Sequence, residues 1–330
     1  MKPQELKESL SRLIDSKIPT FIWGSPGIGK SSIVKQIANE NNLDFIDLRL
    51  SLLDPTDLKG IPFFDSQSKE AVWAKPEFLP KSGEGILFLD EINSAPPSVQ
   101  AAAYQLVLDR KVGDYVLPSG WAIVAAGNLE SDRGVVYRMP SPLSNRFVHL
   151  NMEISFDDWK IWAYEKNIDN SILAFLSYKS EYLFNFDPKK NEKAFATPRS
   201  WEYVDSILKS KISFNNQLEV ISGAVGEDAS LEYISFRKVL DKLPDIKALL
   251  NGDKFDFEQD SEVLFALISA LISYLKSATP KEIDKAIELS FNLPSEFSVM
   301  LIKDMQQNGI EIEDSKAFEE WVEKFSYLLE

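Results

Sequence analysis

The sequence predicts an α/β domain, in which a parallel sheet is flanked by helices, followed by an all-α region. A glycine-rich loop lies between an apolar strand and an amphipathic helix within residues 19–40. Two further apolar stretches, residues 86–91 and 121–128, have the length and continuous apolar character of buried parallel strands. From Asn151 onward the apolar residues follow helical spacing. The sheet is therefore expected in the N-terminal half of the chain and helices in the rest.

The glycine-rich loop is predicted to bind phosphate. Residues 24–31 read Gly-Ser-Pro-Gly-Ile-Gly-Lys-Ser and fit the G-x-x-x-x-G-K-[ST] pattern of nucleotide hydrolases. The glycines let the backbone wrap closely around an anion, with its N–H groups pointing inward. Lys30 adds a positive charge over the outer phosphates, and the Ser31 hydroxyl can reach a magnesium ion. The residues expected to bind the nucleotide are Ser25, Pro26, Gly27, Ile28, Gly29, Lys30, Ser31 and Ser32.

The apolar strand at residues 86–91 ends in two carboxylates, Asp90 and Glu91. In open α/β sheets, ligands bind at the carboxyl ends of the strands. Asp90 is therefore expected to hold the magnesium ion, directly or through water. Glu91 is expected to orient and activate the attacking water as a general base. The alternative interpretation is a pair of carboxylates that only caps the following helix.

Asn128 and Arg146 complete the candidates in the N-terminal half. The strand at residues 121–128 ends in Asn128, which would lie beside the two carboxylates in a parallel sheet. There it could hold the attacking water or sense the terminal phosphate; the alternative is an asparagine that only forms a turn. A last core strand is predicted within residues 143–150, with Arg146 just before it.

The remaining elements connect or cover these strands. Residues 54–60 are polar and rich in turn-forming residues, and hairpins are predicted at residues 61–75 and 110–118. Thr197 is expected to cap a helix with Pro198 in its first turn, which places Arg199 at a helix N-terminus. A strand is predicted at residues 44–50, with helices at 4–16, 98–108, 216–226, 230–241, 261–277, 280–290, 294–307 and 315–328. The predicted domains are a nucleotide-binding core at residues 1–150, a helical domain at 151–250 and an acidic helical extension at 251–330.

The composition excludes several kinds of site. The chain has no cysteine and a single histidine, His149, so disulfides, thiolate metal sites and most histidine-based catalysis are excluded. The net charge is −15, and residues 251–330 carry 17 acidic residues against 7 lysines, a surface that repels a phosphate backbone. The N-terminus is polar, and the longest apolar run, residues 263–275, is too short to span a bilayer. No membrane span and a cytoplasmic location are therefore expected.

Four motifs give the chain a resemblance to the AAA+ ATPases, and within them to the MoxR-like group. The resemblance covers roughly residues 15–210. The motifs are Asp90-Glu91-Ile92-Asn93-Ser94-Ala95-Pro96-Pro97, Ala126-Gly127-Asn128, Pro142-Leu143-Ser144-Asn145-Arg146-Phe147 and Thr197-Pro198-Arg199. The resemblance implies ATP and Mg²⁺ as cofactors. It also implies that Asn128 is sensor one and that Arg199 is sensor two, in a helical lid formed by residues 151–250. Arg146 would be an arginine finger that reaches the neighbouring subunit's nucleotide.

The resemblance further implies a homo-hexameric ring that remodels a protein client in a chaperone-like way, with or through a partner that carries a von Willebrand factor A domain. The hairpins at residues 61–75 and 110–118 resemble two family insertions that project into or around the channel of the ring. The helical extension after residue 251 has no counterpart in this resemblance.

Two other functions stay open. One is an AAA+ motor or loader that acts on nucleic acid, for which the negative charge of the chain is unfavourable. The candidate nucleic-acid contacts are the basic residues of the two hairpins: Lys69, Lys75, Arg110 and Lys111. The other is a P-loop kinase that acts on a small molecule. Arg146 and Arg199 count against a kinase, which needs an acceptor pocket and no arginine from a neighbouring subunit.

Overall fold

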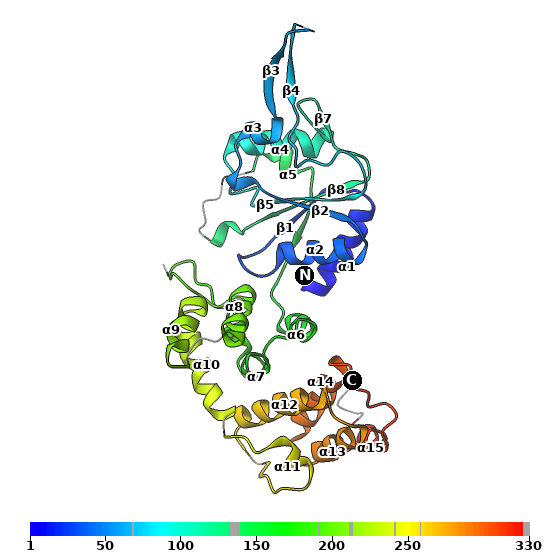
Figure 1. The fold of residues 1–330 in the computed structure, drawn as a ribbon, viewed down its shortest axis with the longest axis vertical. Coiled ribbons are helices and arrows are strands. Elements are labelled where there is room, and N and C mark those ends of the chain that lie inside the picture. Colours follow the sequence, from blue (N-terminus) through cyan, green and yellow to red (C-terminus); the bar gives the residue numbers. More distant parts are fainter. Residues whose placement is uncertain are drawn as a thin grey trace. The chain divides into compact units, whose positions relative to one another are not determined.

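The computed structural model describes residues 1–67, 69–132, 137, 139–190, 192–210, 214–240, 242–257 and 259–325. The chain divides into two compact units. Unit 1 comprises residues 1–155 with the short segment 187–190, and unit 2 comprises residues 156–186 with the described part of 191–330 (Figure 1). Unit 1 is α/β and the described part of unit 2 is helical, so the predicted α/β core followed by an all-α region is confirmed.

A five-stranded parallel sheet forms the centre of unit 1, with the strand order β2-β5-β8-β1-β9. The strands are β1 (Thr20–Trp23), β2 (Asp44–Arg49), β5 (Gly85–Asp90), β8 (Trp121–Gly127) and β9 (Val148–Asn151). Each neighbouring pair runs in parallel. The carboxyl ends of β1, β5 and β8 therefore meet at one edge of the sheet.

Helices cover both faces of this sheet. Helices α1 (Pro3–Asp15) and α2 (Lys30–Glu40) lie on one side and α4 (Pro97–Asp109) lies on the other (Figure 1). Leu87 and Leu89 of β5 belong to the same buried cluster as Val99 and Ala102 of α4. Because both faces are covered, β5 is buried from Gly85 to Leu89, as its unbroken apolar run predicts.

Two hairpins accompany the sheet, close to the predicted positions. The first consists of β3 (Ile61–Asp65) and β4 (Glu70–Ala74) and projects from unit 1 (Figure 1). The second consists of β6 (Lys111–Val112) and β7 (Tyr115–Val116), directly after α4. The predictions at residues 61–75 and 110–118 are confirmed.

The segment at residues 54–60 differs from the expectation of a turn-rich connection. It contains the short helix α3 (Pro55–Lys59). The Asp54 side chain accepts a hydrogen bond from the backbone N–H of Asp57, and the Asp57 side chain accepts one from the backbone N–H of Asp54. Pro55 starts the helix, because its fixed φ suits the first turn. Two aspartates and a proline thus stabilise a helical turn that composition alone does not separate from a loop.

The last core strand follows Arg146, as predicted, but the residues before Arg146 form a helical turn that was not predicted. Residues 141–144 form the helical turn α5 (Ser141–Ser144), and the strand β9 starts only at Val148. Pro142 lies in the first turn of α5, where its fixed φ favours a helix and where a missing N–H has no cost. Arg146 consequently lies in the turn between α5 and β9.

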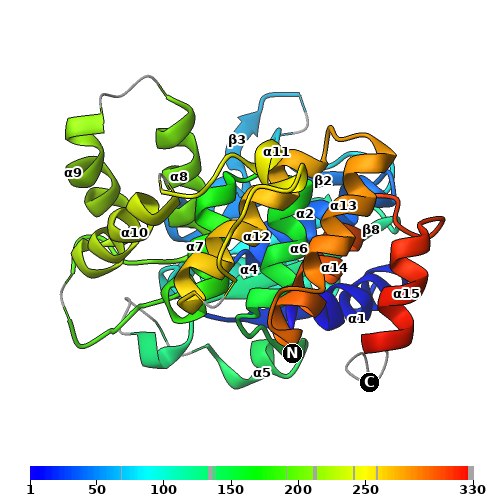
Figure 2. The ribbon, with the colours of Figure 1, turned by 90° about the horizontal axis from the view of Figure 1, so that it is seen from below.

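Unit 2 contains helices that share one hydrophobic core, which runs from Trp159 to Phe325. Its helices are α6 (Phe156–Glu165), α7 (Asn170–Tyr178), α8 (Pro198–Lys209), α9 (Phe214–Val225), α10 (Glu227–Leu240), α11 (Ile246–Leu250), α12 (Ser261–Leu275), α13 (Pro280–Ser290), α14 (Ser295–Gln307) and α15 (Lys316–Phe325). The apolar run at residues 263–275 lies in α12, which packs along α7 (Figures 1 and 2). Residues 151–250 and 251–330 both contribute to this core, and the predicted domain boundary between them stays a prediction.

A buried polar network joins the two ends of unit 2. The ammonium group of Lys160 in α6 donates to both carboxylate oxygens of Asp304 in α14, at 2.6 and 2.9 Å. The Tyr164 hydroxyl donates to the same carboxylate at 3.0 Å. Within the described part of the chain, no helix has the length and apolar character needed to cross a membrane.

Candidate functional site

The loop between β1 and α2 has the geometry of an anion site. Gly27 and Gly29 have φ values of +78° and +103°, which favour glycine over other residues. The first intrahelical hydrogen bond of α2 runs from Ile33 N to Gly29 O at 3.0 Å. The N–H groups of residues 30–32 therefore have no acceptor within the helix and face its N-terminal end, where a phosphate would be stabilised.

Lys30 links this loop to Asn128. Its side chain is nearly buried, and the ammonium group donates to Gly24 O at 2.6 Å, Ser25 O at 2.9 Å and Asn128 Oδ1 at 3.1 Å. Asn128 follows β8, the strand between β1 and β5. The predicted phosphate-binding lysine and the predicted sensor asparagine thus lie in direct contact.

Asp90 and Glu91 lie at the same edge of the sheet, after β5. Glu91 has a φ of +56°, an uncommon conformation for a residue other than glycine and one often found at functional sites. Its carboxylate accepts a hydrogen bond from the hydroxyl of Ser51, which follows β2. Asp90 Oδ1 accepts a hydrogen bond from the Glu91 backbone N–H at 2.9 Å.

The charges around Asp90 favour a cation. Burial raises the pKa of Asp90, and the negative charges of Asp47 and Glu91 raise it further. The hydrogen bond from Glu91 N–H and the positive charge of Lys30 lower the pKa again in part. A carboxylate and a serine hydroxyl are ligands that Mg²⁺ accepts together with phosphate and water. The residues Asp90 and Ser31 therefore fit the predicted magnesium ion.

Sequence reasoning did not single out three residues of this edge: Asp47, Ser51 and Asn93. Asp47 lies on β2, which also contains Asp44 and Arg49, so a further charged residue there gives no signal. Ser51 lies just after β2, and nothing in its sequence context predicts its contact with Glu91. Asn93 is part of the motif after Asp90, and it is 1% exposed.

Arg146 lies at the opposite edge of the sheet from the phosphate loop. It is exposed and comes two residues before Val148, which pairs with Thr20 at the start of β1. The phosphate loop follows the other end of β1, at Trp23. Four residues of strand span about 13 Å, so the side chain of Arg146 starts far from the phosphate loop of its own sheet.

Arg199 belongs to unit 2 and lies exposed in the first turn of α8. Thr197 caps this helix, as predicted: its hydroxyl oxygen accepts from Ser200 N at 3.0 Å, and Ser200 Oγ accepts from Thr197 N at 2.8 Å. Partial desolvation raises the pKa of Glu202, and the positive charge of Arg199 offsets part of that rise. Two other arginines of the loop before Arg146, at positions 133 and 138, lie outside the described residues.

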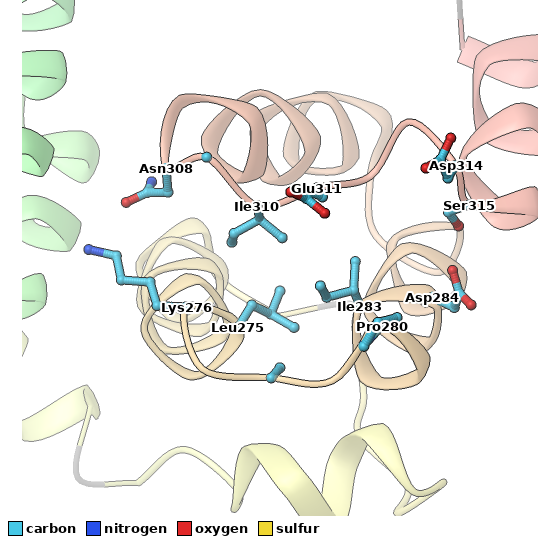
Figure 3. Close-up of a pocket in the computed structure, with 12 residues that line it drawn as sticks. Leu275, Lys276, Pro280, Ile283, Asp284, Asn308, Ile310, Glu311, Asp314 and Ser315 are labelled. Carbon is cyan, nitrogen blue, oxygen red and sulfur yellow. The ribbon is translucent and has the colours of Figure 1, made fainter.

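Unit 2 also contains a pocket of about 550 Å³ between the α12–α13 and α14–α15 connections (Figure 3). Its lining includes the apolar residues Leu275, Ile283 and Ile310, with Lys276 at one end and Asp284 at the other (Figure 3). None of the predicted site residues lines it. Lys30, Asn128, Asp90 and Glu91 lie instead at the carboxyl ends of the strands of unit 1.

Comparison with known protein families gives a match in the part of the chain that contains the parallel sheet. Residues 20–149 match the sequence model of the "ATPase family associated with various cellular activities (AAA)". A stretch of 104 residues is 30% identical to the replication factor C large subunit of Ignicoccus hospitalis. That match covers 32% of this chain and only 20% of the curated relative.

Solved structures with a similar arrangement include NtrX from Brucella abortus and a RuvB variant from Thermotoga maritima. NtrX has a TM-score of 0.44 and 15% identity, over 91% of this chain and 67% of its own. RuvB has a TM-score of 0.40 and 17% identity, over 84% of this chain and 91% of its own. The part of the chain that matches the AAA family model, residues 20–149, contains the phosphate loop, both carboxylates and Asn128.

Proposed function

We propose that this chain is a ring-forming AAA+ ATPase of the MoxR-like group, which hydrolyses ATP to remodel or activate a protein partner. The observation that carries the proposal is the placement of the charged residues on two opposite edges of one sheet. Lys30, Asn128 and the two carboxylates gather at the edge of the phosphate loop, and Arg146 lies at the other edge. In this proposal a second copy of the chain brings its Arg146 to the nucleotide.

Each residue at the phosphate-loop edge has a role in this proposal. Residues 25–32 hold the phosphates of ATP, and Lys30 exchanges an oxygen acceptor such as Asn128 Oδ1 for a phosphate oxygen. Ser31 and Asp90 would hold Mg²⁺, which neutralises phosphate charge when bound. Glu91 takes the proton of the attacking water, and Asn128 orients that water or contacts the terminal phosphate.

The two arginines act from outside this edge. Arg146 is proposed to stabilise charge on the transferred phosphoryl group in the neighbouring subunit of a homo-hexameric ring. Arg199, in the proposed helical lid, is proposed to contact phosphate and couple nucleotide binding to the position of that lid. The exposure of both side chains within their own units supports these roles.

The hairpin β3–β4 supports a protein as the partner. Ile61, Phe63 and Phe64 are 67%, 52% and 70% exposed on this projecting element (Figure 1). Apolar side chains gathered on an exposed element mark contact sites for proteins. A client segment or a partner with a von Willebrand factor A domain would provide the apolar surface that covers them.

A loader or motor on nucleic acid is the second candidate, favoured by the match to replication factor C. The net charge of −15 opposes it. Arg110, one of the candidate basic contacts, donates instead to Pro118 O and Trp121 O at 2.8 and 2.6 Å within its own unit. DNA that stimulates ATP turnover in a salt-dependent way would favour this candidate over the protein partner.

The proposed function is tested by mixing two inactive variants, Arg146→Ala and Glu91→Gln. If Arg146 acts on the neighbouring subunit, some interfaces in the mixture pair an intact Glu91 with an intact Arg146, and ATP turnover partly returns. Each variant alone should turn over ATP at least about 10²-fold more slowly than the wild type. A mixture that stays inactive, although its subunits co-assemble, would contradict the in-trans role.

A further inference from the structure

Asn93 joins three segments of the site in unit 1. It lies two residues after Glu91 and is 1% exposed. Its side-chain nitrogen Nδ2 donates to the backbone oxygen of Asn128 at 2.8 Å. Its own backbone oxygen accepts from Tyr137 N at 2.7 Å, in the segment that leads to α5 and Arg146. One buried residue thus connects the turn that contains Glu91, the end of β8 and the segment before Arg146.

The orientation of the Asn93 amide is fixed by its partner. Asn128 O is an acceptor, so the nitrogen of the amide must face it. The opposite atom, Asn93 Oδ1, is buried and has no hydrogen-bond partner among the described residues. A buried polar atom without a partner lowers stability, so a purely structural position would be better filled by an apolar side chain.

Gly127 leaves the space that this amide occupies. A Cβ added at position 127 would lie 2.4 Å from Asn93 Oδ1 and 2.7 Å from the ring of Phe21. Gly127 directly precedes Asn128, whose side chain accepts a hydrogen bond from Lys30 at 3.1 Å. The position of Asn128 relative to Glu91 therefore depends on the contact between Asn93 and the end of β8.

We infer that Asn93 is a positioning residue for ATP hydrolysis. It fixes the position of Asn128 relative to Glu91. This inference rests on the proposed ATPase function. Asn93 itself touches neither nucleotide nor water; it acts through Asn128. A misplacement of a catalytic group by about 1 Å can slow the chemical step by about 10²-fold, whereas the phosphate loop is left intact.

The first test compares Asn93→Ala with Gln100→Ala. Gln100 is a matched control, because it is also a buried amide, 1% exposed, and donates to a backbone oxygen, Ala95 O, at 3.0 Å. Asn93→Ala should lower kcat about 10- to 100-fold and leave the Kd for ATP within about twofold of wild type. Gln100→Ala should lower the melting temperature without lowering kcat. Equal kcat values for the two variants would overturn the inference.

The second test is a double-mutant cycle with Asn128. If Asn93 acts through Asn128, Asn93→Ala should add nothing to the loss of kcat that Asn128→Ala causes alone. Independent losses that multiply in the double variant would overturn the inference. Wild-type protein that does not hydrolyse ATP would instead overturn the proposed function, so the two failures are distinguishable.

A third variant covers the case in which Asn93→Ala does not fold. Asn93→Asp keeps the shape, and its new carboxyl group can donate to Asn128 O only while it is protonated. The ratio of its kcat to the wild-type kcat should therefore rise as the pH falls through the pKa of that carboxyl. A ratio that is independent of pH, in protein that stays folded, would overturn the inference.

Discussion

The buried polar groups of the two units differ in the partners that surround them. In unit 1, Glu91 has a left-handed backbone, Asn93 has a buried oxygen without a described partner, and the pKa of Asp90 is raised by burial and by nearby negative charge. In unit 2, the buried charges of Lys160 and Asp304 neutralise each other through two hydrogen bonds. Burial raises the pKa of Asp304 as well, but Lys160 and the Tyr164 hydroxyl offset part of that rise, whereas two further carboxylates add to the rise at Asp90.

The largest expected effect is a loss of ATP turnover from a substitution in unit 1 that leaves the fold intact. Glu91→Gln keeps the shape of the side chain and its neighbour Ser51 but removes the base. ATP turnover should fall by about 10²–10⁴-fold, with ATP binding retained. Steady-state turnover and calorimetric titration with ATP measure the two quantities. Near-normal turnover would mean that Glu91 is not the base and that the strain of its backbone has no role in the reaction.

The next effect breaks the charge pairing of unit 2. Asp304→Ala leaves the ammonium group of Lys160 buried without its partner, and the free energy of unfolding should fall by about 3–5 kcal/mol. The control replaces both charges, with Lys160→Met and Asp304→Leu in one chain. This double variant should be close to the wild type in stability, because no charge is left unpaired. Urea denaturation measures both. A single variant as stable as the double one would show that the pairing does not matter.

A smaller effect is expected when the hydrogen bond from Ser51 to Glu91 is removed. The Ser51 hydroxyl donates a hydrogen bond to the Glu91 carboxylate, and this bond must be broken before that oxygen can accept a proton from water. Ser51→Ala should raise basal ATP turnover by about 2- to 10-fold, the value of one ordinary hydrogen bond. Turnover is measured at saturating ATP, with Ser98→Ala as a control on an exposed serine of α4. A fall in turnover would mean that Ser51 helps to place Glu91 for the reaction.

The smallest effect is a pH dependence in unit 2. Glu282 accepts hydrogen bonds from the Tyr274 hydroxyl at 2.5 Å and from Thr279 N at 2.8 Å, which lower its pKa to about 2. A lowered pKa stabilises the fold above the ordinary value of 4.5, and this stabilisation is lost as the pH falls toward 2. Glu282→Gln should therefore be less stable than wild type at pH 6, with a difference that shrinks below pH 4.5. Urea denaturation at several pH values measures this, and a constant difference would contradict it.

The sequence predicts the parts of the site that depend on local pattern. The phosphate loop, the buried strand before Asp90 and the cap at Thr197 each follow from neighbouring residues, and the structure contains these elements. The helical turn α5 was missed because Pro142 favours both a loop and the first turn of a helix. The short distances from Ser51 to Glu91 and from Asn93 to Asn128 depend on strand order, which long-range pairing determines.

The left-handed backbone at Glu91 has a consequence for any effort to make this protein more heat-resistant. A non-glycine residue in this conformation costs about 1–2 kcal/mol, so Glu91→Gly would relieve strain and raise the free energy of unfolding. The same change would remove the proposed base. A screen for thermal stability alone would therefore favour inactive chains at this position, and stability and activity oppose each other at a single residue.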